Sequence, residues 1–205
     1  MVAGNANNPD CASSWVIALT FDQPQIFAVF RQVSVFADGS RAFTNSLQAI
    51  AEITLDESSC ESAPWSFGSY LGLVHAVLAA DTAVYVAGDS PFAEEVVQYT
   101  LDGRATLKMG NRHQSDAPDS LVYVTALSVC SAGLCVLDAN SKKLVVFGPD
   151  GLAVGWVNLS LLLRGVEFIP LGLIVSSPTR AYLSVAVKGR EDTQYTSEIY
   201  RIQGL

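Results

Sequence analysis

Hydrophobic and polar residues alternate along much of the chain in short segments that are bounded by Gly, Asp, Asn and Ser. Clear examples are A-V-Y-V-A-G-D (83–89), G-L-C-V-L-D-A (133–139) and A-Y-L-S-V-A-V (181–187), all rich in aliphatic and β-branched residues. Such segments are typical of β-strands. Helical periodicity is not sustained anywhere, and the ambiguous segment S-L-Q-A-I-A-E-I-T-L (46–55) fits a helix poorly. We therefore predict an almost all-β protein with no helix longer than about three turns.

The strand-like segments recur in units that end on an aromatic residue followed by Asp-Gly. E-V-V-Q-Y-T-L-D-G (95–103) and K-L-V-V-F-G-P-D-G (143–151) both place the aromatic residue three positions before the Asp. S-E-I-Y-R-I-Q-G (197–204) repeats the pattern, and V-S-V-F-A-D-G (33–39) is a looser copy. The glycines of these copies are 64, 48 and 53 residues apart, a spacing that indicates stacked repeats.

Each clear copy has two further β-rich segments before this strand and one after the Asp-Gly pair, so the unit has four strands. Four antiparallel strands, repeated, form the blade of a β-propeller. The Asp-Gly pair would be the tight turn from the third to the outer fourth strand, with Gly at positive φ, and the aromatic residue would pack between blades. We predict about four blades, either complete or part of a larger propeller. The ranges are an N-terminal arm at 1–14 and blades near 15–55, 70–110, 121–160 and 166–205.

The stretch G-L-C-V-L-D-A-N-S-K-K-L-V-V-F-G-P-D-G (133–151) resembles an NHL-type β-propeller repeat. In that family a strand ending in Asp is followed by a short loop and a strand that ends in an aromatic residue before Asp-Gly. T-A-V-Y-V-A-G-D-S-P-F-A-E-E-V-V-Q-Y-T-L-D-G (82–103) is a second match, and the resemblance covers about residues 72–159. It implies the fold. Family members bind proteins, nucleic acids or small molecules, and some related propellers are enzymes, so the fold does not select a function.

Composition narrows the classes of partner. Half of the residues are hydrophobic and mean hydropathy is +0.31, which is typical of a folded chain with a core. The net charge of −8 and a pI near 4.6 argue against nucleic-acid binding, which needs a basic face. No apolar run reaches the roughly 18–20 residues of a membrane span.

The four cysteines favour an oxidising compartment. Cys130 and Cys135 flank S-A-G-L, a plausible hairpin turn, whereas Cys11 and Cys60 lie in polar, loop-like sequence. We predict the disulfides Cys130–Cys135 and Cys11–Cys60; the alternative is four reduced thiols. The first ten residues lack the pattern of a signal peptide, so the protein is either cytosolic or has lost such a segment. The cysteines favour the second reading, an extracellular or secretory location, where the sequon at Asn158 is a glycosylation candidate.

Catalytic and metal-binding signatures are mostly missing from the sequence. It contains no G-x-S-x-G, G-x-G-x-x-G, P-loop, C-x-x-C or H-E-x-x-H motif and only two histidines. His75 lies in the apolar run L-V-H-A-V, where we expect a core or channel residue rather than a ligand. His113 lies near Asp116 and Asp119, which suit calcium as a candidate cofactor, but the loop lacks the dense oxygen-ligand spacing of a calcium site. We expect a solvated loop without a cofactor there.

One face of the predicted propeller collects most of the charged loop residues. In a propeller, the connections from strand two to three and from one blade to the next emerge on the same face. Loops on a rigid scaffold are where binding usually resides. The candidate binding-face residues are Trp65, Glu94, Glu95, His113, Asp116, Asp119 and Arg190.

Three functions fit this reading. The first is a non-enzymatic module for protein binding or assembly, favoured by the missing catalytic signatures. The second is a calcium-assisted hydrolase or lyase acting on a sugar or lactone. It would need carboxylates in the channel, but the predicted inner strands are almost purely apolar, which leaves His75 as the lone candidate. The third, a carbohydrate-binding propeller, ranks last because Trp15, Trp65 and Trp156 form no repeated stacking platform.

The last copy of the repeat stops where its fourth strand should begin. Its third strand, Glu198 to Ile202, would then be an unpaired edge, which invites pairing with another chain. The segment from Trp15 to Phe21 is already needed as the inner strand of the first copy, and Val2 to Ser14 is a poor strand former. We therefore expect another polypeptide to complete this edge, either a missing continuation of a larger propeller or a second subunit.

Overall fold

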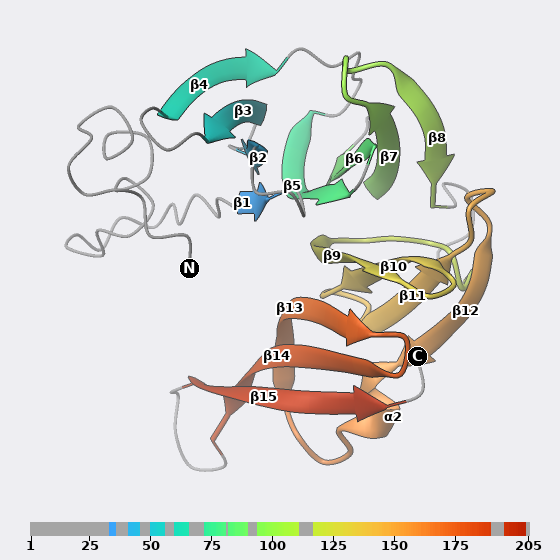
Figure 1. Ribbon diagram of the computed structural model, residues 1–205. Coiled ribbons are helices and arrows are strands. Elements are labelled where there is room, and N and C mark those ends of the chain that lie inside the picture. The colour runs from blue at the N-terminus through green and yellow to red at the C-terminus, as the bar shows by residue number, and fades with distance from the viewer. Residues whose placement is uncertain are drawn as a thin grey trace.

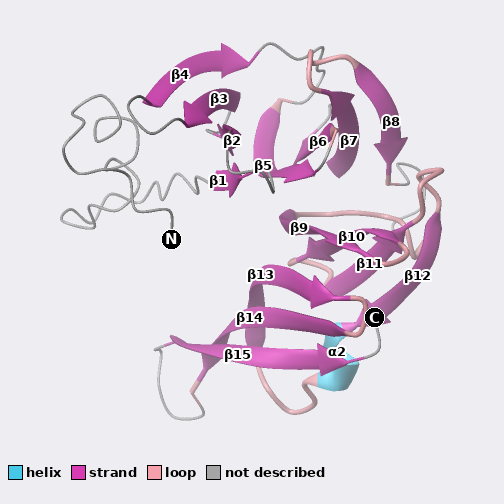
Figure 2. Ribbon diagram, viewed as in Figure 1, coloured by secondary structure: helices cyan, strands magenta, loops and turns pink. Residues whose placement is uncertain are grey.

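The computed structural model describes residues 33–35, 41–45, 50–55, 60–65, 72–80, 82–89, 94–110, 117–189 and 195–203. Within these ranges the protein is all-β, and its one helix is the single turn α2 (Leu159–Leu162), so the predicted fold class is confirmed (Figure 2). No helix in the described part of the chain is long and apolar enough to cross a membrane.

The strands form four antiparallel sheets, here called blades 1 to 4, each ordered as in the sequence. The sheets follow one another along an arc (Figure 1), in which β5 contacts β9 and β9 contacts β13, so the first strand of each blade lies on the inside. Blade 1 comprises β1 (Val33–Val35), β2 (Arg41–Asn45), β3 (Ile50–Leu55) and β4 (Cys60–Trp65). Blade 2 comprises β5 (Leu73–Ala80), β6 (Ala83–Asp89), β7 (Glu94–Thr100) and β8 (Ala105–Met109). Blade 3 comprises β9 (Val124–Cys130), β10 (Gly133–Asp138), β11 (Lys143–Phe147) and β12 (Ala153–Asn158). Blade 4 comprises β13 (Phe168–Ser177), β14 (Arg180–Lys188) and β15 (Tyr195–Gln203).

Blade 1 differs from the sequence-based expectation. Residues 33–39 were predicted to contain a third strand, but Val33–Val35 is the first strand and pairs with β2. The Asp-Gly pair at 38–39 therefore belongs to the connection between the first two strands, and the blade extends to Trp65 rather than ending near 55. Alternation is the same in every strand of a blade, so it does not reveal a strand's position. The predicted arm at 1–14 and the segment 15–21 lie outside the described residues.

The Asp-Gly turns of blades 2 and 3 have the predicted geometry. Gly103 and Gly151 have φ of 82° and 78°, a conformation that glycine adopts without steric cost. Their N–H groups donate to the carbonyls of Thr100 and Gly148 at 2.9 Å, and the predicted fourth strands β8 and β12 follow.

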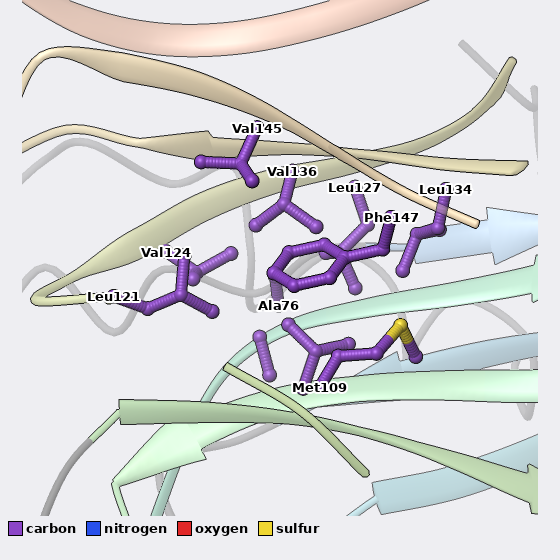
Figure 3. Packing of buried hydrophobic residues seen from close by; sticks show 11 residues of the cluster. Ala76, Met109, Leu121, Val124, Leu127, Leu134, Val136, Val145 and Phe147 are labelled. Atoms are coloured by element: carbon purple, nitrogen blue, oxygen red, sulfur yellow. The ribbon is translucent and has the colours of Figure 1, made fainter. Parts of the chain in front are cut away.

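The repeated aromatic residues pack between blades, as predicted. Tyr99 belongs to a buried cluster shared by blades 1 and 2, and Phe147 belongs to one shared by blades 2 and 3. Figure 3 shows this second cluster, with the Phe147 ring facing Met109 across the interface. The cluster consists of Ala76, Ala87, Val96, Met109, Leu121, Val124, Leu127, Leu134, Val136, Val145 and Phe147.

The hydrogen-bond registers define which positions are equivalent in blades 2, 3 and 4. Counted from the first hairpin of each blade, the third-strand residues Tyr99, Phe147 and Ile202 occupy one position, opposite Val84, Leu134 and Ala181. Ile202 therefore occupies the position that the sequence pattern assigned to Tyr200. In blade 4 the aromatic residue, Tyr200, therefore lies two residues before the position that Tyr99 and Phe147 occupy in their blades.

Serine hydroxyls link the inner strands of two blade pairs. Ser34 Oγ of blade 1 accepts a hydrogen bond from Ala79 N of blade 2 at 2.8 Å. Ser128 Oγ of blade 3 accepts one from Val175 N of blade 4 at 3.0 Å. Leu78 occupies the position of Ser128 in blade 2 and offers no hydroxyl to blade 3.

The disulfide Cys130–Cys135 is present, with a Cα–Cα distance of 5.9 Å. The two-residue turn of this hairpin is Ser131-Ala132, and Cys130 pairs directly with Gly133, so the disulfide runs diagonally across the strands. Cys135 is buried on the side that faces blade 4. The predicted pair Cys11–Cys60 lies outside the described side chains.

We expect Cys130→Ser to lower the free energy of unfolding by about 2 kcal/mol, because the bond closes a short loop in the unfolded chain. The sequence separation is 5. Urea denaturation under non-reducing conditions measures the change. Ser131→Ala, an exposed change in the same turn, is the control and should alter stability by less than about 0.5 kcal/mol. Equal stability of Cys130→Ser and the parent chain would contradict the expectation.

Candidate functional site

The structure places the candidate binding-face residues in three different environments. Glu94 and Glu95 begin β7 and are buried. Asp119 is half-buried in the turn that precedes β9. Trp65 ends β4, and His113, Asp116 and Arg190 lie outside the described residues.

Trp65 does not lie in a surface loop. Its side chain is buried, its Nε1 donates to the carbonyl of Leu101 at 3.0 Å, and its ring meets Phe43 and Tyr99 edge-on at 5.1 and 5.7 Å. The residue therefore packs blade 1 against blade 2. An aromatic residue at the end of a strand is the same core signal that the sequence shows at Tyr99.

Buried charges in blade 3 hold the connection that leads into that blade. Asp138 accepts hydrogen bonds from the N–H groups of Val122, Tyr123 and Ser141 at 2.8–3.2 Å. Lys143, opposite Asp138, donates from Nζ to the carbonyl of Ser120 at 2.8 Å. These charges have backbone partners and need no ligand.

Blade 2 carries a different set of residues at the corresponding place. Glu95 lies opposite Gly88 and occupies the position of Lys143, so Glu94 occupies that of Lys142. Lys142 lies over the ring of Phe168 in the next blade, 4.7 Å from its centroid. Blade 2 thus has two carboxylates at the positions where blade 3 has two ammonium groups, so the charge at this place is negative instead of positive.

His75 lies beside Glu94 because β5 bulges at this point. Val74 and Ala76 pair with consecutive residues of β6, which leaves His75 as the extra residue. A bulge redirects a side chain and is common near functional sites. His75 Nδ1 lies 3.0 Å from Glu94 Oε1, and Nε2 lies 3.8 Å from Asp89 Oδ2. At the corresponding bulge, blades 3 and 4 have Thr125 and Leu171, so the histidine is particular to blade 2.

Burial and charge perturb the groups of this cluster, which comprises His75, Asp89 and Glu94. Burial raises the pKa of Glu94 to about 7, although His75 and the Val124 N–H favour the ionised form. Burial lowers the pKa of His75, but the hydrogen bond and charge of Glu94 outweigh it and the net shift is upward. Burial and the charges of Glu94 and Asp89 also raise the pKa of Tyr123, whose ring lies 4.5 Å from that of His75.

The inner surface of the arc is mostly apolar among the described residues. A hollow of about 330 Å³ opens on the inner strands and continues onto blade 4. The polar side chains of its lining are Ser34, Ser184 and Tyr182; the other lining residues are Val77, Leu78, Ala126, Leu127, Gly172, Leu173, Ile174 and Ile199. No carboxylate lines this hollow among the described residues.

Blade 4 exposes the sheet face that its predecessors bury. Val96 and Leu144, at equivalent positions of β7 and β11, are 0% and 1% exposed because the following blade covers them. Ile199 occupies this position in β15 and is 74% exposed. We call this surface the open face; it also carries Ile169, Ile174, Tyr182, Tyr195 and Arg201.

The edge of blade 4 is also unpaired within the described residues. The sheet order is β13-β14-β15, so β15 has a neighbouring strand on one side, whereas blades 1 to 3 have a fourth strand at this place. This matches the edge predicted at Glu198 to Ile202. The open face and the free edge are adjacent.

Comparison with known proteins supports the fold. No family model and no curated protein matches the chain. Among solved structures, the N-terminal domain of Nup159 matches with 14% identity and a TM-score of 0.50, over 85% of this chain and 44% of that chain. The Pan2 WD40 domain of Neurospora crassa matches with 13% identity and a TM-score of 0.50, over 87% and 52%. Hydrazine synthase of Kuenenia stuttgartiensis matches with 10% identity and a TM-score of 0.53, over 83% and 48%.

These likenesses show a β-propeller fold and no shared activity, since the identities are low. They do not distinguish an NHL-type repeat from other propeller repeats. This chain spans about half the length of these three solved chains. The blades described here therefore correspond to part of a propeller ring.

Proposed function

We propose that this chain is a non-enzymatic β-propeller module for assembly, and that its open face binds a second copy of the chain. The observation that carries the proposal is the exposure of Ile199 at a position that is buried in the two preceding blades. Each described blade-to-blade interface is an apolar sheet face covered by the next blade. The open face of blade 4 is the equivalent surface, but no further described blade packs on it.

A second copy fits the open face better than a small partner does. The chain covers about half of the Nup159 and Pan2 domains that it matches, so two chains together supply the length of one such ring. The face is broad and contains aliphatic side chains from β13 and β15, which suits another sheet rather than a short peptide.

The rival functions have less support. The hydrolase or lyase requires polar groups in the channel, and the hollow is mostly apolar. For carbohydrate binding, Trp65 is buried and Trp156 is the exposed tryptophan of the described residues, so no platform of stacked rings forms. We also propose that the chain is an NHL-type propeller and that it is secreted. The Cys130–Cys135 disulfide fits an oxidising compartment and supports the second point.

We expect light scattering on the purified chain at micromolar concentration to give twice the chain mass of 21.8 kDa. The association should persist in high salt, because apolar contacts carry most of it. A mass that stays at one chain at all concentrations, or that grows without limit as concentration rises, would contradict a two-copy ring.

A further inference from the structure

We propose that His75, Asp89 and Glu94 form a binding site for a divalent transition-metal cation of the zinc class. One ligand atom from each residue lies within 4.8 Å of those of the other two. Zinc bonds to nitrogen and carboxylate oxygen are about 2.0–2.2 Å long, so a small rotation of the side chains brings all three into range. Asp89 is free to make that rotation because its side chain is 46% exposed.

The second observation is an unsatisfied oxygen in the middle of the cluster. The Glu94 side chain is 0% exposed. Its Oε1 accepts from Val124 N at 3.0 Å, but its buried Oε2 has no hydrogen-bond donor among the described residues. The polar group beside Glu94 is instead the Asp89 carboxyl, which raises the pKa of Glu94 further. A buried acceptor without a partner is costly and calls for an explanation, such as an unseen ion. A bound cation would satisfy this oxygen.

The donor set selects the class of cation. One neutral imidazole and two carboxylates carry a charge of −2 in total, which a divalent ion neutralises. Imidazole is a ligand for zinc, iron, nickel and copper, whereas calcium and magnesium prefer oxygen ligands alone. The imidazole lies between the two carboxyl groups, so a metal would replace the proton on the nitrogen that it binds. Three protein ligands would leave further coordination positions open, toward the exposed side of Asp89.

Comparison with blade 3 shows that the blade fold does not itself require these three residues. At the corresponding places blade 3 has Thr125 at its bulge and Lys142 at the start of its third strand. Neither residue is a metal ligand of this class. The buried charges of blade 3 are satisfied by backbone groups, whereas Glu94 of blade 2 has one oxygen, Oε2, without a donor among the described residues.

Titration of the full chain with Zn²⁺, followed by calorimetry and elemental analysis, tests the proposal. We expect one equivalent bound at micromolar affinity or tighter, and at least a tenfold loss of affinity in Asp89→Asn. Asp89 is suitable for the first variant because its exposed side chain makes misfolding a minor risk. Glu167→Gln, which changes an exposed carboxylate on blade 4, is the matched control and should bind like the parent chain.

The visible spectrum of bound Co²⁺ identifies the ligands without reference to activity. We expect a spectrum of nitrogen and oxygen ligation, without the intense thiolate band that coordination by cysteine would give, and its loss in His75→Gln. The proposal is overturned if no stoichiometric metal binds, if calcium binds and zinc does not, or if Asp89→Asn and Glu167→Gln bind equally well. It is also overturned if the thiolate band appears.

Discussion

Replacing Ile199 by Asp should leave the chain folded and weaken its self-association at least about 100-fold, which corresponds to about 2.7 kcal/mol. Two terms contribute. The dimer loses the burial of an aliphatic side chain, worth about 1.5–3 kcal/mol, and must bury a carboxylate among apolar groups, which costs more. In the free chain Ile199 is 74% exposed, so the same change should alter stability little. Sedimentation or light scattering across a concentration series measures the affinity.

Val154→Asp is the matched control. Val154 is a β-branched residue on an outer strand, exposed to a similar extent, but it lies on blade 3 and not on the open face. Its variant should associate like the parent chain. If both variants associate normally, the open face is not the interface, and if both lose association, the effect is one of net charge rather than of the face.

Phe147→Ala should lower the free energy of unfolding by about 3–5 kcal/mol, the typical cost of removing a buried phenylalanine ring. Phe147 is fully buried between blades 2 and 3, in contact with a cluster that draws on both (Figure 3). The ring is surrounded by side chains from two hydrogen-bonded sheets, whose backbones limit collapse around it. A cavity should therefore remain, and chemical denaturation measures its cost.

Two further variants serve as controls for Phe147→Ala. Phe147→Leu retains most of the volume and should cost clearly less than Phe147→Ala. Trp156→Ala removes a larger ring from the exposed fourth strand of the same blade and should cost less than either. A loss below about 1 kcal/mol for Phe147→Ala would mean that the blade interface is not the stabilising core described here.

The parts of the fold that local chemistry determines were predictable from the sequence. Gly103 and Gly151 mark turns that need positive φ, and Tyr99 and Phe147 mark the buried end of a third strand. The hairpin disulfide followed from two cysteines that flank a short turn. Each of these signals lies within a few residues of the feature that it predicts.

Features that depend on register or on contact between distant segments were not predictable. The place of Val33–Val35 in blade 1 was misjudged because every strand of a blade alternates in the same way. The cluster of His75, Asp89 and Glu94 arises from a bulge and from three strands meeting at one end of a blade. A signal was available: aligning the repeats places Glu94 and Glu95 where the next blade has Lys142 and Lys143, a reversal of charge at one half-buried and one buried position.

The serine links between inner strands divide the described blades into two pairs. Ser34 joins blade 1 to blade 2, and Ser128 joins blade 3 to blade 4, each through a backbone N–H group. Between blades 2 and 3 Leu78 replaces the inner-strand serine, and the N–H of Val124 instead donates a hydrogen bond across that interface to the Glu94 carboxylate. At this interface a carboxyl group from the third strand of blade 2 thus takes the place that an inner-strand serine has at the two neighbouring interfaces.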